Sequence, residues 1–316
     1  MTIQQGVGGA PPPSTVAAAA TAAPAVRTRT EERASSSNRL LSRILYIGVL
    51  VLATLIFVFP FLWLVSASLK TRADVFSNEF IILPLQFHNY SDVLAIAPMA
   101  RWFVNSALVG VLAAVTVTIS SAIVAFGFAY FRFPFRNVLF GLVLASMMLP
   151  GAVLMIPNFL IWNALGQVNS PLFTPLWAGN LFASAFYVFL LRQFFLGLPR
   201  ELFEAARVDG ASYPRMFWSV AVPLTRAALI VVFIFELKAS WTDLVKPLIF
   251  MRDITLYTLP LGLKSLVDRF NPTTGGEGEF QLVMAASVIV TLPMILVFFL
   301  GQRYFLEGIA TTGSKG

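Results

Sequence analysis

The chain has 316 residues, of which 58% are hydrophobic and only 12% are charged, with a formal net charge of +7. Because an ordinary soluble domain carries about 25% charged residues, this composition predicts a membrane protein. The chain has no cysteine and a single histidine, His88, which excludes a disulfide framework, a thiolate metal site and a cysteine nucleophile. It also has no GxxxxGK[ST] phosphate loop. We therefore expect no catalytic residue, no metal site and no cofactor bound by this chain.

The N-terminal segment, residues 1–40, is rich in Ala, Pro, Ser and Thr, and its first 26 residues carry no charged side chain. Such a segment cannot bury a core, so it predicts a disordered tail. The apolar run that follows is longer than the roughly 7–15 residues of a signal-peptide core and starts late in the chain, so we expect it to remain as a membrane anchor. Residues 41–316 are expected to form one transmembrane domain.

Six apolar runs have the length that a membrane-spanning helix needs, roughly 20 residues. They extend over about 44–66, 103–130, 138–161, 174–196, 223–245 and 281–302. These runs predict an all-α, polytopic membrane protein with six transmembrane helices. The second run carries small residues at Ser121, Ala125 and Ala129, a spacing that suits either close packing within the chain or a subunit interface.

The distribution of arginine and lysine predicts the orientation, because short loops rich in these residues stay in the cytoplasm. Most of them lie on the side that holds both termini and segment 197–222. They are Arg27, Arg29, Arg33, Arg39, Arg43, Arg132, Arg136, Arg192, Arg200, Arg207, Arg215, Arg226, Arg303 and Lys315. We expect a multi-pass protein of the bacterial inner (plasma) membrane with cytoplasmic termini and external segments at 67–102 and 246–280. No basic face with aromatic platforms is apparent, so we expect no nucleic-acid partner.

Segment 197–222 is a polar interruption between the fourth and fifth runs. Pro199 can open a helix, and Glu204 lies in its early turns, where a carboxylate favours the positive end of the helix dipole. Asp209 and Gly210 signal a helix stop and a turn. The segment therefore predicts a short helix followed by a turn on the cytoplasmic surface.

The first of these helices carries an apolar stripe made by Leu202, Phe203 and Ala206. A second short helix, over about 212–219, leads to Pro223 at the start of the fifth span. Together the two helices predict an elbow that lies along the membrane surface.

The elbow resembles the EAA loop of ABC importer permeases, in which Glu-Ala-Ala is followed by three residues, Gly, nine residues and Ile-x-Leu-Pro. This chain has Glu204-Ala205-Ala206, Gly210 and Val220-Ala221-Val222-Pro223 at that spacing. The resemblance implies the type I importer permease fold, with this elbow as a coupling helix. It further implies that Glu204 pairs with a basic residue of the ATPase subunit, that Ala205 and Ala206 allow close approach, and that Asp209 and Gly210 form the turn. Alternatively, Glu204 only favours its own helix dipole, which is worth about 0.3–1 kcal/mol.

Further stretches from residue 41 to the C-terminus are similar to the same family. They are Arg101-Trp102-Phe103-Val104-Asn105-Ser106, Ala125 to Phe133, Met148-Leu149-Pro150, Ile156-Pro157, Trp241-Thr242-Asp243 and the tail Glu307 to Gly316. The tail looks like that of the carbohydrate-uptake branch, which includes maltose-type and glycerol-phosphate-type importers. The resemblance implies import of a sugar, oligosaccharide or sugar derivative. It also implies a second homologous permease, an external binding protein and two ATPase subunits that bind ATP and Mg²⁺ and hydrolyse ATP, so that this chain is not itself an enzyme.

The fifth run contains ionisable residues, which are costly within a membrane and mark polar pathways or structural pairs. Glu236, Ser240, Asp243 and Pro247 share a face by helical spacing. We expect this face to line the translocation path; the alternative is a structural pair with the partner permease. Lys238 lies outward of mid-span and can extend its ammonium group to the interface.

Residues 268–280 contain Asn271-Pro272 and Gly275-Gly276 between polar residues. Such a composition is typical of any flexible external hairpin, which is one interpretation of the segment. In the maltose-type family a loop at this place can reach the binding protein, so Asn271, Gly275 and Gly276 are candidates for that contact.

Two functions of other classes remain open from the residues alone. An ion-gradient-driven secondary transporter could use Glu236 and Asp243 as ion sites, although the chain shows no inverted repeat. A membrane enzyme lacks support, because the chain offers no cysteine, one histidine and no cluster of metal ligands.

Overall fold

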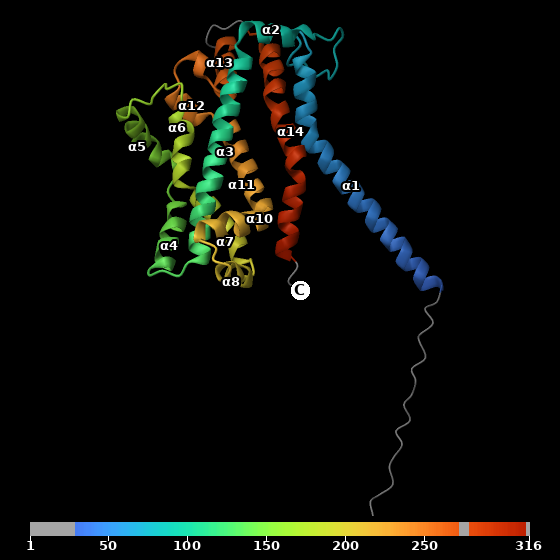
Figure 1. The fold of residues 1–316 in the computed structure, drawn as a ribbon. Coiled ribbons are helices and arrows are strands. Elements are labelled where there is room, and N and C mark those ends of the chain that lie inside the picture. The colour runs from blue at the N-terminus through green and yellow to red at the C-terminus, as the bar shows by residue number, and fades with distance from the viewer. Residues whose placement is uncertain (1–28, 272–277, 314–316) are drawn as a thin grey trace, which may run out of the picture. The chain divides into compact units, whose positions relative to one another are not determined.

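The computed structural model describes residues 29–271 and 278–313, and every regular element in those two ranges is a helix (Figure 1). The chain divides into two units, Met1–Phe59 and Pro60–Gly316. Most of the expected tail, residues 1–28, lies outside the described residues, as do Gly275 and Gly276.

The first helix, α1, extends over Arg29–Ser68 and therefore begins within the segment that we expected to be a disordered tail. Its apolar part, Ser42–Ser68, is long enough to cross a membrane. Large side chains such as Leu45 and Phe57 are exposed along it, which suits a helix surrounded by lipid. Where α1 ends, the buried amide of Asn89 donates hydrogen bonds to the carbonyl oxygens of Ser68 at 2.9 Å and Lys70 at 3.0 Å. This contact ties α2 (His88–Ile96) to the end of α1.

The second unit is built around α3 (Met99–Tyr130), which packs against both α7 (Ala185–Leu196) and α11 (Arg226–Thr242) (Figure 1). Helix α14 (Phe280–Gly313) packs against α11. The small residues Ser121, Ala125 and Ala129 of α3 are buried, and the two alanines belong to the core cluster formed with α7. The sequence left open close packing within the chain or a subunit interface, and the burial of these residues corresponds to close packing within the chain.

Within residues 29–271 and 278–313, four helices are long and apolar enough to cross a membrane, and two bent helix pairs bring the number of candidate spans to as many as six if each pair is counted as one. In the first pair, α4 (Arg136–Ser146) and α5 (Gly151–Ala164) meet at 94°. The sequence predicted one helix over 138–161. It is interrupted because Pro150 has no N–H to donate and adopts an extended conformation before α5.

The fourth predicted span, 174–196, is also not one regular helix. It consists of α6 (Thr174–Trp177), the 3₁₀ turn η1 (Ala178–Phe182) and α7, with Ala183 at a φ of +67°. The neighbouring helix α3 provides hydrogen-bond partners for part of this irregular backbone. Ser120 Oγ donates to Asn180 O at 2.7 Å, and Ser184 N donates to Ser121 Oγ at 3.1 Å. Broken helices within membranes need such side-chain partners.

The elbow between α7 and α11 contains α8 (Arg200–Val208), α9 (Tyr213–Met216), the π turn η2 (Phe217–Ala221) and α10 (Val222–Leu224). The chain then bends by 82° into α11, which begins at Arg226. Pro223 lies inside α10, so the bend is at Thr225 rather than at the proline. The hydroxyl of Thr225 donates to Ala221 O at 2.8 Å.

At the other end of α3, side chains from about one turn of this helix bind the segment that connects α12 (Val245–Phe250) to α13 (Leu259–Phe270). That segment contains η3 (Ile254–Leu256). Trp102 Nε1 donates to Ile254 O at 2.8 Å, and the Asn105 amide donates to Thr255 O and Tyr257 O at 3.0 and 2.9 Å. Ser106 Oγ accepts from Leu259 N at 2.7 Å. These bonds give the Arg101–Ser106 stretch a structural role.

Candidate functional site

The turn of the elbow is a Schellman motif. Gly210 has a φ of +78°, its N–H donates to Arg207 O at 3.0 Å, and Ala211 N donates to Ala206 O at 2.9 Å. Asp209 is the C-cap residue of α8. The positive φ favours glycine because other residues meet a steric penalty there. The helix stop that the sequence predicted at Asp209 and Gly210 is therefore confirmed.

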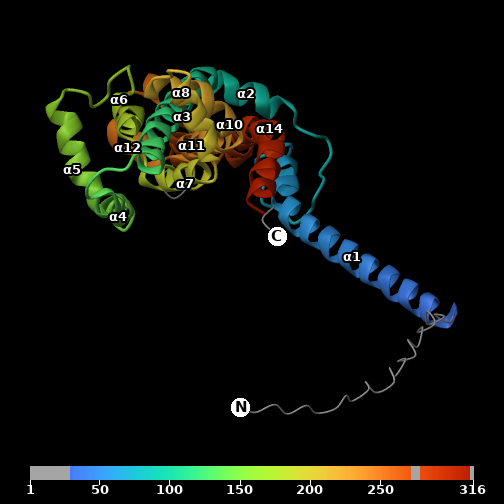
Figure 2. The same ribbon diagram turned by 60° about the horizontal axis from the view of Figure 1, so that its bottom comes forward.

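The elbow is attached to the bundle by an aromatic cluster around Phe126 of α3. The Phe126 ring centroid lies 6.0 Å from that of Phe203 on α8 and 5.4 Å from that of Phe217 on η2. Phe195, at the end of α7, lies 5.7 Å from the same ring. All four rings are buried. These contacts join α3 and α7 to both parts of the elbow. Figure 2 shows α8 beside α3 and near α10.

The remaining surface of α8 faces outward. Glu204, Ala205 and Gly210 are exposed, and Ala206 is half-buried. Leu202, which the sequence assigned to the packed stripe, is 43% exposed, so only Phe203 is buried in the core. The outer face of α8 thus combines a carboxylate, small residues and an apolar side chain.

Glu204 also borders a cleft of about 370 Å³ between α8 and the end of α3. The cleft has a cationic lining that includes Arg132, Arg200 and Arg207. Within residues 29–271 and 278–313, the ion pairs involve other groups, and Glu204 is paired with none of these arginines. Its carboxylate is available to a cation from outside the chain.

A second cleft, of about 150 Å³, lies at the membrane-embedded face predicted from the fifth run. Its lining consists of Val109, Leu176, Glu236, Ala239, Ser240, Asp243, Lys246, Pro247 and Thr258. The structure therefore brings Glu236, Ser240, Asp243 and Pro247 together, although α11 ends at Thr242 and the helical spacing does not continue to Pro247. Lys238 is exposed and does not line the cleft.

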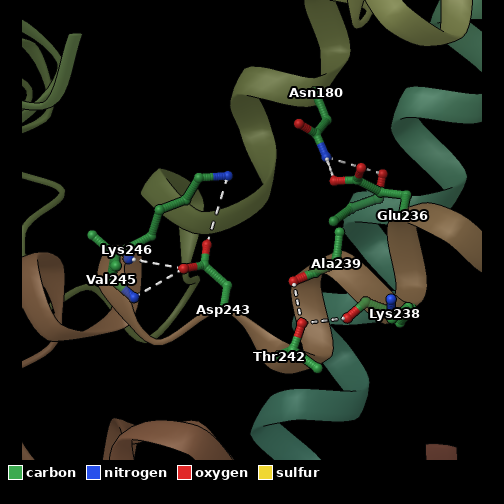
Figure 3. A network of polar contacts seen from close by, with 9 residues as sticks. Asn180, Glu236, Lys238, Ala239, Thr242, Asp243, Val245 and Lys246 are labelled. Carbon is green, nitrogen blue, oxygen red and sulfur yellow. Dashed lines mark hydrogen bonds and ion pairs between the residues drawn. The ribbon is translucent and has the colours of Figure 1, made fainter. Parts of the chain in front are cut away.

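Glu236 is anchored inside the bundle rather than free to move. The Asn180 amide donates to Glu236 Oε1 at 2.7 Å and is also 3.2 Å from Ala113 O of α3 (Figure 3). The Tyr187 hydroxyl of α7 forms a further hydrogen bond with Glu236. A half-buried carboxylate with two such partners joins η1, α7 and α11. The sequence alone did not predict the roles of Asn180 and Tyr187, although the polar Gly179-Asn180 pair within an apolar run was an available signal.

Asp243 occupies the break between α11 and α12. Its Oδ1 accepts from Val245 N at 2.9 Å and Lys246 N at 3.2 Å, and its Oδ2 lies 3.9 Å from Lys246 Nζ (Figure 3). The carboxylate thus caps the start of α12. Thr258, opposite, is buried, and its hydroxyl has no hydrogen-bond partner among the described residues. A polar solute that entered the cleft would meet a hydroxyl, a carboxylate and an ammonium group.

Asn271 is the C-cap residue of α13 and has an extended backbone. The chain returns to this helix after residues 272–277, because Gly278 N donates to Phe270 O at 3.0 Å. The two ends of that segment are therefore held close together.

Comparison with known sequences identifies the family of the chain. Residues 118–310 match the family described as "Binding-protein-dependent transport system inner membrane component". The arabinooligosaccharides transport system permease protein AraQ of Bacillus subtilis is 31% identical over 274 residues, covering 84% of this chain and 93% of AraQ. The lactose transport system permease protein LacG of Rhizobium radiobacter is 30% identical, covering 86% of this chain and 96% of LacG. The sn-glycerol-3-phosphate transport system permease protein UgpE of Agrobacterium fabrum is 31% identical, covering 87% and 98%.

A solved structure has the same fold. It is a bacterial ABC transporter involved in the import of the acidic polysaccharide alginate, with a chain that is 25% identical and superposes with a TM-score of 0.73 over 85% of this chain and 98% of its own length. These findings disfavour the secondary transporter that the residues alone left open. The chain belongs to the binding-protein-dependent transport system inner membrane components, the multi-pass permease subunits of ABC importers.

Proposed function

We propose that this permease imports a sugar, an oligosaccharide or a sugar derivative, delivered by an external binding protein and driven by ATP hydrolysis on two separate subunits. AraQ, LacG and UgpE are permeases for arabinooligosaccharides, lactose and glycerol phosphate, respectively. The chain would pair with a second homologous permease, and its six spans would place both termini and the elbow in the cytoplasm, since the arginine-rich side stays there.

The observation that carries the proposal is the division of α8 into two faces. Phe203 is buried in the aromatic cluster around Phe126, whereas Glu204 and Ala205 are exposed. One face is attached to the bundle and the other is open to a partner. We propose that the ATPase subunit holds the open face, with Glu204 pairing with a basic residue and Gly210 setting the turn.

Reversing the charge at Glu204 tests this coupling role. Glu204→Lys should reduce both ATPase co-purification and ATP-driven uptake by at least about tenfold, because loss of a desolvated charge pair at an interface costs about 2–5 kcal/mol. Glu201→Lys is the matched control, since Glu201 is also exposed on α8 and lies nearly one turn earlier. Unaltered assembly and uptake in Glu204→Lys would remove Glu204 from the coupling contact.

We further propose that the 150 Å³ cleft around Ser240, Asp243 and Thr258 lines the translocation path. Hydroxyl and carboxylate groups at the edge of a membrane cavity suit the hydroxyl groups of a carbohydrate. Glu236 belongs to the same lining, but its bonds to Asn180 and Tyr187 assign it a positioning role.

The two carboxylates should therefore respond differently to neutralisation. We expect Asp243→Asn to lower the uptake rate several-fold without changing the yield of assembled transporter. We expect Glu236→Gln to lower the free energy of unfolding by about 1–3 kcal/mol, because half-buried Asn180 and buried Tyr187 would lose a charged acceptor. Uptake at the wild-type rate in Asp243→Asn would argue against a path through this cleft.

The segment after Asn271 would face the external binding protein. Its ends are held together at Phe270 and Gly278, so shortening it should leave the bundle intact. We expect a deletion of residues 273–277, which keeps Gly278, to impair delivery from the binding protein while ATPase assembly is retained. Normal uptake by this deletion variant would exclude the loop contact.

A further inference from the structure

A basic pocket lies at the arginine-rich end of the bundle, where α3 leads into α4, and none of the roles proposed above uses it. The pocket has a volume of about 350 Å³ and is lined by Arg132, Phe133, Phe135, Arg136, Asn137 and Val138. Only Arg132 also borders the cleft beneath α8. The pocket is on the same end as the elbow, since Phe131, its immediate neighbour in the chain, contacts Tyr213 with ring centroids 4.9 Å apart.

The lining of this pocket contains two arginines and no acidic residue. Arg192 of α7 places its guanidinium carbon 4.2 Å from the centroid of Phe140, one helical turn after Arg136 on α4. The ion pairs found within residues 29–271 and 278–313 include none of Arg132, Arg136 and Arg192. The Nε atom of Arg192 is buried and has no hydrogen-bond partner within the described residues. Arg132 and Arg136 line the same pocket, so their positive charges repel each other, and an anion between them would relieve the repulsion.

Donor groups in the pocket suit a phosphate. Arg136 holds one guanidinium nitrogen at 3.2 Å from Phe131 O, which fixes the side chain while other N–H groups remain for an anion. Arginine presents several donors in a planar fork that matches phosphate oxygens. Helix α4 begins at Arg136, so the positive end of its dipole adds to the same field.

The surface next to the pocket is apolar and uncovered. Phe135 is 76% exposed, Val138 61% and Leu142 62%. Val138 and Leu142 are four residues apart on one side of α4, and Phe135 directly precedes the helix. A free phosphate would gain nothing from this surface, whereas the acyl chains of a lipid would. An anionic headgroup site beside an apolar helix face is the arrangement expected for a bound phospholipid.

We propose that this pocket binds the phosphodiester headgroup of an anionic phospholipid, with its acyl chains along Phe135, Val138 and Leu142. Basic pockets between transmembrane helices on the cytoplasmic side bind such headgroups. The bound lipid would neutralise Arg132 and Arg136 and fix the connection between α3 and α4 beside the elbow.

The test uses the full-length chain, purified in detergent and titrated with phosphatidylglycerol or phosphatidylcholine, with bound lipid counted by native mass spectrometry. Arg132→Gln with Arg136→Gln should weaken phosphatidylglycerol binding about fivefold for each arginine removed. Phosphatidylcholine should bind weakly to all forms. Arg226→Gln is the matched control, because Arg226 is an exposed arginine predicted on the same side but outside the pocket, and it should bind as the unchanged chain does.

A third variant and a competitor distinguish a lipid from a soluble anion. Leu142→Gln keeps all the charges, so it should weaken lipid binding several-fold while the thermal unfolding temperature stays within a degree or so of the unchanged chain. Equal phosphatidylglycerol binding by the double arginine variant and Arg226→Gln would overturn the site. Displacement of the lipid by millimolar inorganic phosphate, with Leu142→Gln unaffected, would overturn the lipid as its ligand.

Discussion

Trp102 and Gly262 form a residue-scale contact that sets how closely α3 and α13 approach. A Cβ atom added to Gly262 would lie 2.1 Å from Trp102 Cε3, and Trp102 is only 1% exposed. The indole also donates to Ile254 O at 2.8 Å, so it cannot move away without losing that bond. The glycine is required here by close packing, not by its backbone conformation.

Gly262→Ala should therefore destabilise the chain by about 1–3 kcal/mol, the usual cost of adding an atom to a filled core. The measurement is thermal unfolding of the purified chain in detergent. Gly141→Ala is the control, because nothing lies within 4 Å of a Cβ atom there. Equal stability of both variants would show that the contact between Trp102 and Gly262 relaxes freely.

The sequence predicted the role of a residue when that role depends on one short segment of the chain. The stop at Asp209-Gly210 needs only local backbone bonds, so composition and spacing were sufficient. Asn180 and Tyr187, by contrast, obtain their role from Glu236, which lies far along the chain. A single sequence carries no direct record of such distant pairs.

At the scale of elements, the Phe126 ring is a shared contact between the bundle and both parts of the elbow. Phe126 contacts Phe195, Phe203 and Phe217, which belong to α7, α8 and η2. The neighbouring Phe128 instead contacts Phe133 and Phe140, on the α4 side of α3. Two phenylalanines separated by one residue thus serve different connections.

Phe126→Ala should loosen the elbow, because removing a buried phenylalanine ring costs about 3–5 kcal/mol. We expect faster hydrogen exchange of the amides in α8 and η2, measured by mass spectrometry. Phe128→Ala is the control, because it also removes a phenyl ring, but one on the other side of α3. It should leave exchange in α8 unchanged. Equal exchange in α8 for both variants would mean that Phe126 does not anchor the elbow.

Element boundaries were predicted well where apolarity alone defines them and less well where proline and irregular turns intervene. The span predicted at 103–130 corresponds to α3, Met99–Tyr130. The span predicted at 138–161 is bent by 94° at Pro150, and the one at 174–196 is interrupted at Ala183. A hydropathy pattern shows which residues prefer lipid. It does not show where a neighbouring helix provides hydrogen bonds to the backbone of a broken helix.

At the scale of the whole molecule, the unit that begins at Pro60 has differently built ends. At one end, Trp102, Asn105 and Ser106 hold the backbone between α12 and α13. At the other, aromatic rings hold the elbow while its outer face stays exposed. Long helices connect the two ends, so movement imposed on the elbow can reach the cleft around Asp243 through α3 and α11.

The exposed face of α8 is the surface on which we propose that the ATPase subunit acts. The chain has no cysteine, so single cysteines can be introduced without a background. Ala205→Cys is the test position, and Val104→Cys, exposed near the opposite end of α3, is the control. Cross-linking of the assembled transporter with a short bifunctional thiol reagent, against cysteines placed across the ATPase surface, is the most direct measurement. We predict that Ala205→Cys cross-links to the ATPase subunit and that the cross-link stops ATP-driven uptake, whereas Val104→Cys does neither. An assembled, active transporter in which Ala205→Cys cross-links to no ATPase position would contradict the account.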